Sequence, residues 1–84
     1  MWAQNLFNLL STLMPSIKSM DATDIKAYTK QLKFFTDRAI NKTDIELLTK
    51  IIKDWVSTQK DLYFRIVKPL DGVEQGFSVF MRYK

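Results

Sequence analysis

The first apolar stretch of the chain repeats with the period of a helix. Apolar side chains recur three or four residues apart, and the polar residues between them carry no charge; the apolar seam consists of Trp2, Leu6, Leu9 and Leu13. This spacing places the seam on one face of a helix. Because Pro15 cannot continue a helix, the pattern predicts a helix over about 2–14.

A longer helical pattern occurs twice. The block at 23–35, which begins Thr-Asp-Ile, recurs in altered form at 43–55. Each copy has an apolar seam at spacings of three and four, formed in the first by Ile25, Tyr28, Leu32, Phe35 and Ala39 and in the second by Ile45, Leu48, Ile52 and Trp55. The seams predict helices over about 22–38 and about 43–59. A connection as short as 39–42 predicts that these helices form an antiparallel helical hairpin.

Beyond about Lys60 the pattern changes from helical to alternating. Two runs rich in aromatic and β-branched residues flank a segment that contains Asp71-Gly72 and Gly76. The alternation predicts a two-stranded antiparallel β-hairpin over about 62–84, with Phe77, Val79, Met81 and Tyr83 on one face. On its outer face we expect Phe80, Arg82 and Lys84 to lie across from Tyr63, Arg65 and Val67.

These elements predict an α+β protein that forms a single small domain over 1–84, with three helices followed by a C-terminal two-stranded antiparallel β-hairpin. Two strands alone are marginally stable in water. The hairpin must therefore pack on the helices, pair with a second copy of the chain, or join a partner's sheet. The wide apolar face of the first helix also leaves a homodimer open.

Three helices followed by a hairpin are also the elements of a winged-helix DNA reader. The helix expected to read the bases would be the one over 43–59. Thr43 and Glu46 have the spacing of a capping box at its start, and Asp44 lies between them. Because these acidic side chains would repel phosphate, the winged-helix interpretation is disfavoured.

The charge balance is mildly basic, with thirteen Lys and Arg against nine Asp and Glu, a formal net charge of +4 and a pI near 9.5. This excess suits nucleic acid or an acidic protein surface. The chain has no Cys and no His, which removes the usual zinc ligands and the commonest general base, so we expect no enzyme, no metal and no cofactor. The run from Trp2 to Met14 is interrupted by polar residues and has no basic leader, so we expect neither a signal peptide nor a membrane helix. A cytoplasmic location is expected, in the host if the protein is viral.

Two surfaces are candidates for binding. The first is a basic stripe expected along the helical hairpin, where lysines can contact phosphates without reading sequence. The second is the outer face of the β-hairpin, where basic and aromatic residues alternate. Such a face suits base stacking or a protein interface.

From these features we expect a non-enzymatic protein that docks on a larger protein as a regulator, inhibitor or adaptor, of the kind that phages and plasmids encode. Its expected contacts are Trp2, Phe7, Leu10, Tyr63, Arg65, Phe80 and Arg82. The alternative is a nucleic-acid-binding regulatory protein that uses both candidate surfaces. Its contacts would be Lys26, Lys30, Lys33, Lys50, Lys53, Arg65, Arg82 and Lys84.

Overall fold

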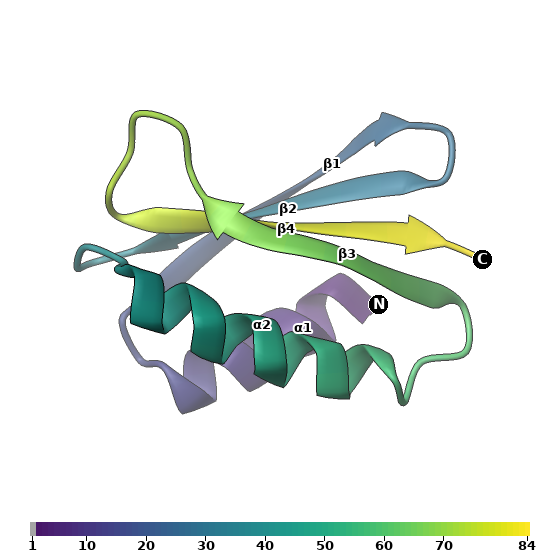
Figure 1. The fold of residues 1–84 in the computed structure, drawn as a ribbon, viewed down its shortest axis with the longest axis horizontal. Coiled ribbons are helices and arrows are strands. Elements are labelled where there is room, and N and C mark those ends of the chain that lie inside the picture. The colour runs from purple at the N-terminus through teal and green to yellow at the C-terminus, as the bar shows by residue number, and fades with distance from the viewer. Residues whose placement is uncertain (1) are drawn as a thin grey trace.

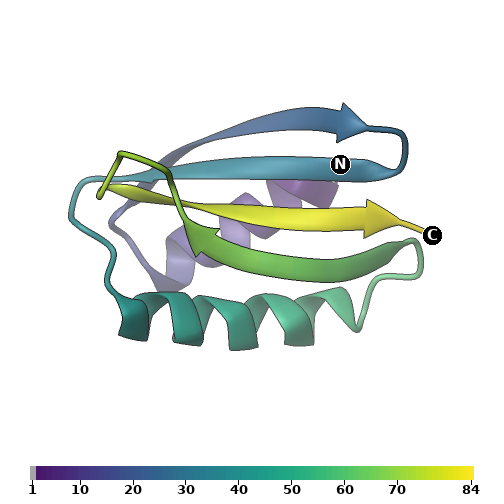
Figure 2. The same ribbon diagram turned by 45° about the horizontal axis from the view of Figure 1, so that its top comes forward.

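The computed structural model describes residues 2–84, and it has two layers: a four-stranded sheet and two helices that cover one of its faces (Figure 1). The elements in chain order are α1 (Trp2–Leu13), β1 (Ile17–Lys26), β2 (Thr29–Thr36), α2 (Lys42–Val56), β3 (Leu62–Pro69) and β4 (Gly76–Tyr83). In Figure 2 α2 lies below the sheet and α1 is seen behind the strands. One face of the sheet is therefore packed on helices and the other is left open.

The sheet is antiparallel throughout, with strand order β1-β2-β4-β3. β4 lies between β2 and β3, with Leu32 of β2 opposite Val79 on one side and Val67 of β3 opposite Val79 on the other. β1 and β3 form the two edges. The C-terminal hairpin is thus completed by β2 of its own chain.

The core lies between the inner face of the sheet and the helices. Its largest fully buried side chains are Phe34, Phe77, Leu6, Leu10, Leu32, Leu48, Ile52, Met81 and Val79. The rings of Phe34 and Phe77 stack across β2 and β4 with their centroids 4.8 Å apart. Burial of side chains of this size supplies the main driving force for folding.

The prediction of three helices and a lone hairpin was wrong, because the segment predicted as a helix over 22–38 forms parts of β1 and β2. The helical hairpin therefore does not exist, and neither does the order of elements of a winged helix. In the predicted seam only Leu32 is fully buried, whereas Ile25 is 47% exposed and Tyr28 65% exposed. The inner face instead follows the period of two that a strand requires, with Leu32, Phe34 and Thr36 buried.

The turn between β1 and β2 gave no signal in the sequence. It has no glycine, proline or asparagine; instead Tyr28 adopts a positive φ of 69°. This left-handed conformation is uncommon for a bulky residue. The Tyr28 carbonyl accepts a hydrogen bond of 2.8 Å from the backbone N–H of Tyr83, which fixes the turn against the end of β4.

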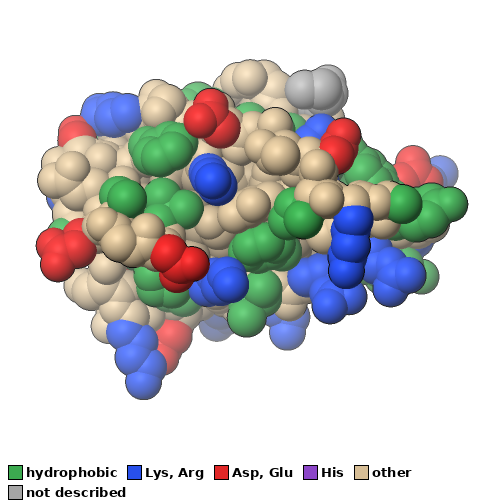
Figure 3. All heavy atoms as spheres, turned by 90° about the horizontal axis from the view of Figure 1, so that it is seen from above, with side chains coloured by type: hydrophobic (Ala, Val, Ile, Leu, Met, Phe, Trp, Pro, Cys, Tyr) green, Lys and Arg blue, Asp and Glu red, His purple; other side chains and the backbone are tan. Residues whose placement is uncertain are grey.

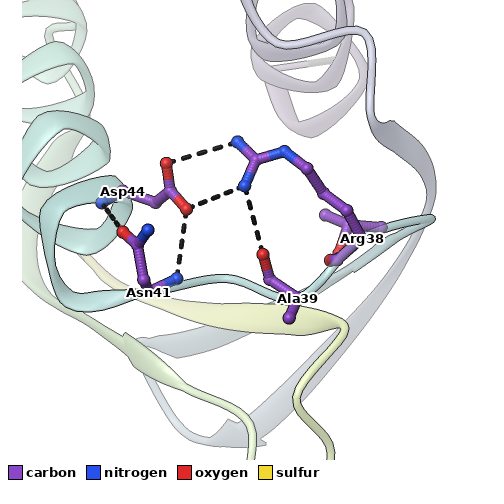
Figure 4. Close-up of polar contacts among 5 residues, drawn as sticks. Arg38, Ala39, Asn41 and Asp44 are labelled. Carbon is purple, nitrogen blue, oxygen red and sulfur yellow. Dashed lines mark hydrogen bonds and ion pairs between the residues drawn. The ribbon is translucent and has the colours of Figure 1, made fainter.

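The start of α2 is held by a capping box and an ion pair (Figure 4). The Asn41 side chain accepts a hydrogen bond of 2.8 Å from the backbone N–H of Asp44, whose carboxylate accepts one of 3.1 Å from the backbone N–H of Asn41. Arg38 donates two hydrogen bonds of 2.9 and 3.2 Å to the same carboxylate. The Arg38 guanidinium, and then the Asn41 N–H, lower the pKa of the Asp44 carboxyl.

The capping box predicted at Thr43 and Glu46 was wrong, because the helix is capped two residues earlier, at Asn41.

Within residues 2–84, no helix is both long enough and apolar enough to cross a membrane.

Candidate functional site

The face of the sheet turned away from the helices carries basic and aromatic side chains, and we call it the open face. Alternate residues of the strands point to it, as the register shows: Tyr63 lies opposite Arg82, Ile66 opposite Phe80 and Lys68 opposite Ser78. The open face is formed by Ser19, Asp21, Thr23, Lys26, Thr29, Gln31, Lys33, Phe35, Tyr63, Arg65, Ile66, Lys68, Ser78, Phe80 and Arg82. These side chains come from all four strands.

The cations of the open face have no acidic partners within bonding distance. Among residues 2–84 the ion pairs are Lys18–Asp37, Lys30–Asp24 and Arg38–Asp44, and none involves Lys26, Lys33, Arg65, Lys68 or Arg82. Asp21 lies opposite Lys33 in the register of β1 and β2, so Lys33 has a carboxylate on the same face. Unpaired cations on one surface produce a positive potential that attracts anions.

Two cations lie over aromatic rings instead. Lys68 Nζ is 5.1 Å from the ring centroid of Phe80, and Lys84 Nζ is 5.0 Å from that of Tyr63. At an exposed site such a contact is worth about 0.5–1 kcal/mol. The rings are therefore weakly covered and remain accessible to a planar ligand.

The open face is hollowed on both sides of Phe80. The larger hollow, about 450 Å³, spans the sheet from Ile25 and Lys26 on β1 to Arg65 and Lys68 on β3. Because β1 and β3 are opposite edges, the sheet must curl to bring them to one hollow; the end of the β1–β2 hairpin rises above the rest of the sheet in Figure 1. The smaller hollow, about 290 Å³, includes Lys33, Phe35 and Asp71.

Figure 3 looks onto this face from above, and its basic side chains gather toward the lower right, with apolar side chains among them. The outer side of α2 is different. There a shallow depression is lined by Lys50 and Lys53 together with Glu46 and Asp54, so opposite charges balance. The excess of positive charge is thus concentrated on the sheet rather than on the helices.

The lysine stripe predicted along two helices is not formed. Lys26 and Lys33 lie on the open face, while Lys30 points to the helical side, where its Nζ is 5.7 Å from the Trp2 ring. Lys50 and Lys53 lie on α2. The first copy of the repeat is a strand pair and the second a helix, so the five lysines occupy separate surfaces.

The residues predicted on the first helix belong to the packing of the protein. Leu10 is 1% exposed. Trp2 lies against Trp55 and Tyr83, with ring centroids 6.3 and 6.2 Å away, and Phe7 stacks on Phe34. Packing therefore accounts for Leu10, whereas Trp2 and Phe7 are only half-buried and Leu13, at the end of α1, is 57% exposed.

The predicted hairpin residues Tyr63, Arg65, Phe80 and Arg82 come together on the open face. Val67 was expected beside them but is buried against the helices, because an irregularity between Phe64 and Ile66 shifts the alternation by one residue. The same shift turns Ile66 and Lys68 outward. Sequence reasoning missed Ile66, Lys68 and Phe35 as candidates; the exposed side of β2 was hidden by its assignment to a helix.

The open face offers groups that can bind a ligand. Within the described residues no group of three or more Asp and Glu side chains is arranged to hold a metal ion. The face offers guanidinium and ammonium groups, aromatic rings and the Gln31 amide, which donates a hydrogen bond of 3.2 Å to Ser78. Comparison with protein-family models, with curated proteins and with solved structures finds no significant match.

Proposed function

We propose that the protein binds single-stranded nucleic acid on the open face of its sheet. The observation that carries the proposal is the larger hollow, where Phe80 lies among four cations, Lys26, Arg65, Lys68 and Arg82, with no carboxylate in the lining. Proteins that bind single strands combine a positive groove along the backbone with aromatic rings on which bases stack. The open face has both components.

The relative strength of two contacts supports base stacking here. In the free protein Lys68 lies over Phe80 at 5.1 Å. A stacked base is worth about 1–3 kcal/mol. An exposed cation–π contact is worth about 0.5–1 kcal/mol. A base therefore displaces the ammonium from the ring, and Lys68 remains close enough to contact a phosphate.

Single strands fit this face better than duplex. Phe80 is half-buried at the floor between the hollows, so only a base that has left its own stack can reach its ring. Bases in a duplex are stacked and paired inside it. Duplex then contacts only the cations, which gives weaker and more salt-sensitive binding.

Anisotropy titrations of a labelled oligothymidylate of about 12 nucleotides, and of a duplex of equal length, test the proposal. We expect tighter binding of the single strand, with affinity that falls steeply between about 50 and about 200 mM salt. Equal affinity for both ligands would leave only a general attraction to phosphate. No binding at the lower salt concentration would rule out the proposal.

Docking on a larger protein, as a regulator, inhibitor or adaptor, remains a second proposal, now on the open face rather than on α1. The observation that favours it is the exposure of apolar side chains: Ile66 is 50% and Tyr63 53% exposed on the open face, and Ile25, which lines the larger hollow, is 47% exposed. A protein interface uses aliphatic as well as aromatic and arginine contacts. A cytoplasmic location is part of both proposals.

Affinity capture from the native host with the wild-type protein and with Ile66→Asp separates the two proposals. Docking predicts a stoichiometric protein partner that the variant fails to recover and that resists nuclease treatment and about 200 mM salt. Recovery of no partner protein, or of one that nuclease releases, would remove this second proposal.

A further inference from the structure

The larger hollow has the size of a site for one small ligand, and it shares Lys68 and Phe80 with the smaller hollow. Its volume of about 450 Å³ lies in the range of small-ligand pockets in proteins. Its walls come from both edge strands, so it is bounded on two sides, and the smaller hollow lies beyond Phe80. A hollow of this size accommodates one monomer of a polymeric ligand.

Its lining separates into an apolar part and a charged part. Phe80 and Ile66, from neighbouring strands, lie opposite each other in the register of β3 and β4. Arg65, Lys68 and Arg82 surround them from the same two strands, and Lys26 faces them from β1. A flat apolar surface beside several cations is complementary to a base that carries a phosphate on the same small molecule.

The two hollows differ in electrostatics. The smaller one is lined by Lys33, Lys68 and Asp71 among its charged residues, and Asp21 lies opposite Lys33 across β1 and β2. The larger one has four cations and no carboxylate among its lining residues. A phosphate therefore prefers the larger hollow, since each carboxylate near the smaller one repels it.

We propose that the larger hollow is a mononucleotide site, in which one base stacks on Phe80 while its phosphate is bound by Arg65 and Arg82. This inference rests on the proposed function and deepens it, because a bound single strand would place one of its nucleotides in this site. It also predicts something that a purely electrostatic groove does not: a free nucleoside monophosphate binds by itself and competes with the oligonucleotide.

Isothermal calorimetry with thymidine 5′-monophosphate, thymidine and inorganic phosphate tests the site in the full-length protein. We expect thymidine 5′-monophosphate to bind at least about tenfold more tightly than either fragment, because the stacking and charged contacts act together. If inorganic phosphate binds as tightly as thymidine 5′-monophosphate, the site recognises charge alone. If thymidine binds as tightly as the monophosphate, the site recognises the base alone. Either outcome overturns the inference, and so does the absence of binding.

Three variants locate the site. Arg65→Gln and Phe80→Leu are each expected to weaken thymidine 5′-monophosphate by about tenfold. Lys33→Gln, on the same face but in the smaller hollow, is expected to change it by less than about twofold. Arg65 is exposed, so its variant keeps the test valid if Phe80→Leu proves unstable. Equal losses in Arg65→Gln and Lys33→Gln would contradict a discrete site.

Competition separates this inference from the proposed function. If the oligothymidylate binds and thymidine 5′-monophosphate fails to displace it, the mononucleotide site is wrong and single-strand binding stands. If the mononucleotide binds and the oligonucleotide does not, the site stands and single-strand binding is wrong. Displacement by the mononucleotide, at concentrations where inorganic phosphate has no effect, supports both.

Discussion

The two faces of the sheet are made from alternate residues of the same strands, but their aromatic side chains have different surroundings. On the inner face Phe34 and Phe77 are completely buried, and their rings stack on each other. On the open face Phe80 is half-buried and its ring lies under the exposed Lys68. Packing in the core explains the inner rings, whereas Phe80 lies outside that core, where the proposed binding would give it a role.

The charged groups show the same contrast. Arg38 and Asp44 are paired with each other and with the first turn of α2, so their role is structural. Within the described residues, Arg65 and Arg82 on the open face have no ion-pair partner. Charges with partners stabilise the fold, and charges without them are available to a ligand.

The largest expected effect is on stability, when the two kinds of ring are truncated in turn. Phe34→Ala is expected to lower the free energy of unfolding by about 3–5 kcal/mol, because it leaves a cavity in the core. Phe80→Ala is expected to cost about 1–2 kcal/mol, since its ring is less buried and lies outside the core. Urea denaturation followed by circular dichroism measures both. Similar losses for the two variants would show that the faces do not differ as described.

The next largest effect is on the affinity for the oligothymidylate, when two positive charges are removed either from the open face or from α2. The double variant Arg65→Gln, Arg82→Gln is expected to weaken binding of the oligothymidylate at least about tenfold. The slope of log K against log salt concentration should fall in magnitude by about 1.4, because two phosphate contacts are lost. Lys50→Gln with Lys53→Gln removes the same charge from α2 and is expected to change affinity by less than about threefold. Anisotropy titrations at several salt concentrations measure both quantities. Equal losses would indicate that net charge alone governs binding.

A smaller effect tests the charges that are structural. Asp44→Asn removes the ion pair with Arg38 and weakens the capping box, and is expected to cost about 1 kcal/mol at neutral pH. Because the folded state lowers the pKa of Asp44, its contribution is present above the ordinary carboxyl pKa of about 4 and is lost as the pH falls through the lowered value. The difference between wild type and variant should therefore shrink in acid, as thermal melts at several pH values can measure.

Glu46→Gln on the same helix is the matched control for this prediction. Glu46 is exposed and lies outside the capping box, so we expect little change in stability at any pH. If Glu46→Gln lowers the stability as much as Asp44→Asn does, the capping box predicted at Thr43 and Glu46 would be supported instead.

The smallest effect concerns the turn at the end of the β1–β2 hairpin. Tyr28 has a positive φ that asparagine tolerates better. Tyr28→Asn is therefore expected to raise the free energy of unfolding by about 0.5 kcal/mol, as urea denaturation would show. A loss of stability instead would mean that contacts of the Tyr28 ring, although it is 65% exposed, stabilise the protein more than its backbone strain destabilises it.

The sequence was informative where one periodicity was strong. α1 and α2 lie where helical seams predicted helices, and β3 and β4 lie where alternation predicted a hairpin. In β4 the alternation also assigned the faces, because Phe77, Val79 and Met81 are buried and Arg82 is exposed. These segments are regular enough for one pattern to exclude the other.

The middle of the chain was misread for physical reasons. Leu32 fits a helical seam and a strand face equally well, and the Thr-Asp-Ile that opens 23–35 also stands at the start of the helical copy at 43–55. Local sequence left the choice open, and pairing of β2 with β4 decided it. A turn that uses Tyr28 in place of glycine concealed the boundary between two strands.

The candidate site was half predictable. Tyr63, Arg65, Phe80 and Arg82 followed from alternation in the hairpin, while the contribution of β1 and β2 required the sheet itself. Irregularities in the pairing hid further residues, since each one changes which face the following side chain occupies. Tertiary pairing, rather than any motif, brings Lys26 to the same hollow as Arg65.

Mapping the amide resonances by NMR during a titration with oligothymidylate is the most direct test that the open face binds the ligand. The largest shifts are expected at open-face positions on β3 and β4, especially Arg65, Phe80 and Arg82, with little change along the outer side of α2. Shifts centred on Lys50 and Lys53, or no shifts at low salt, would contradict single-strand binding on the open face.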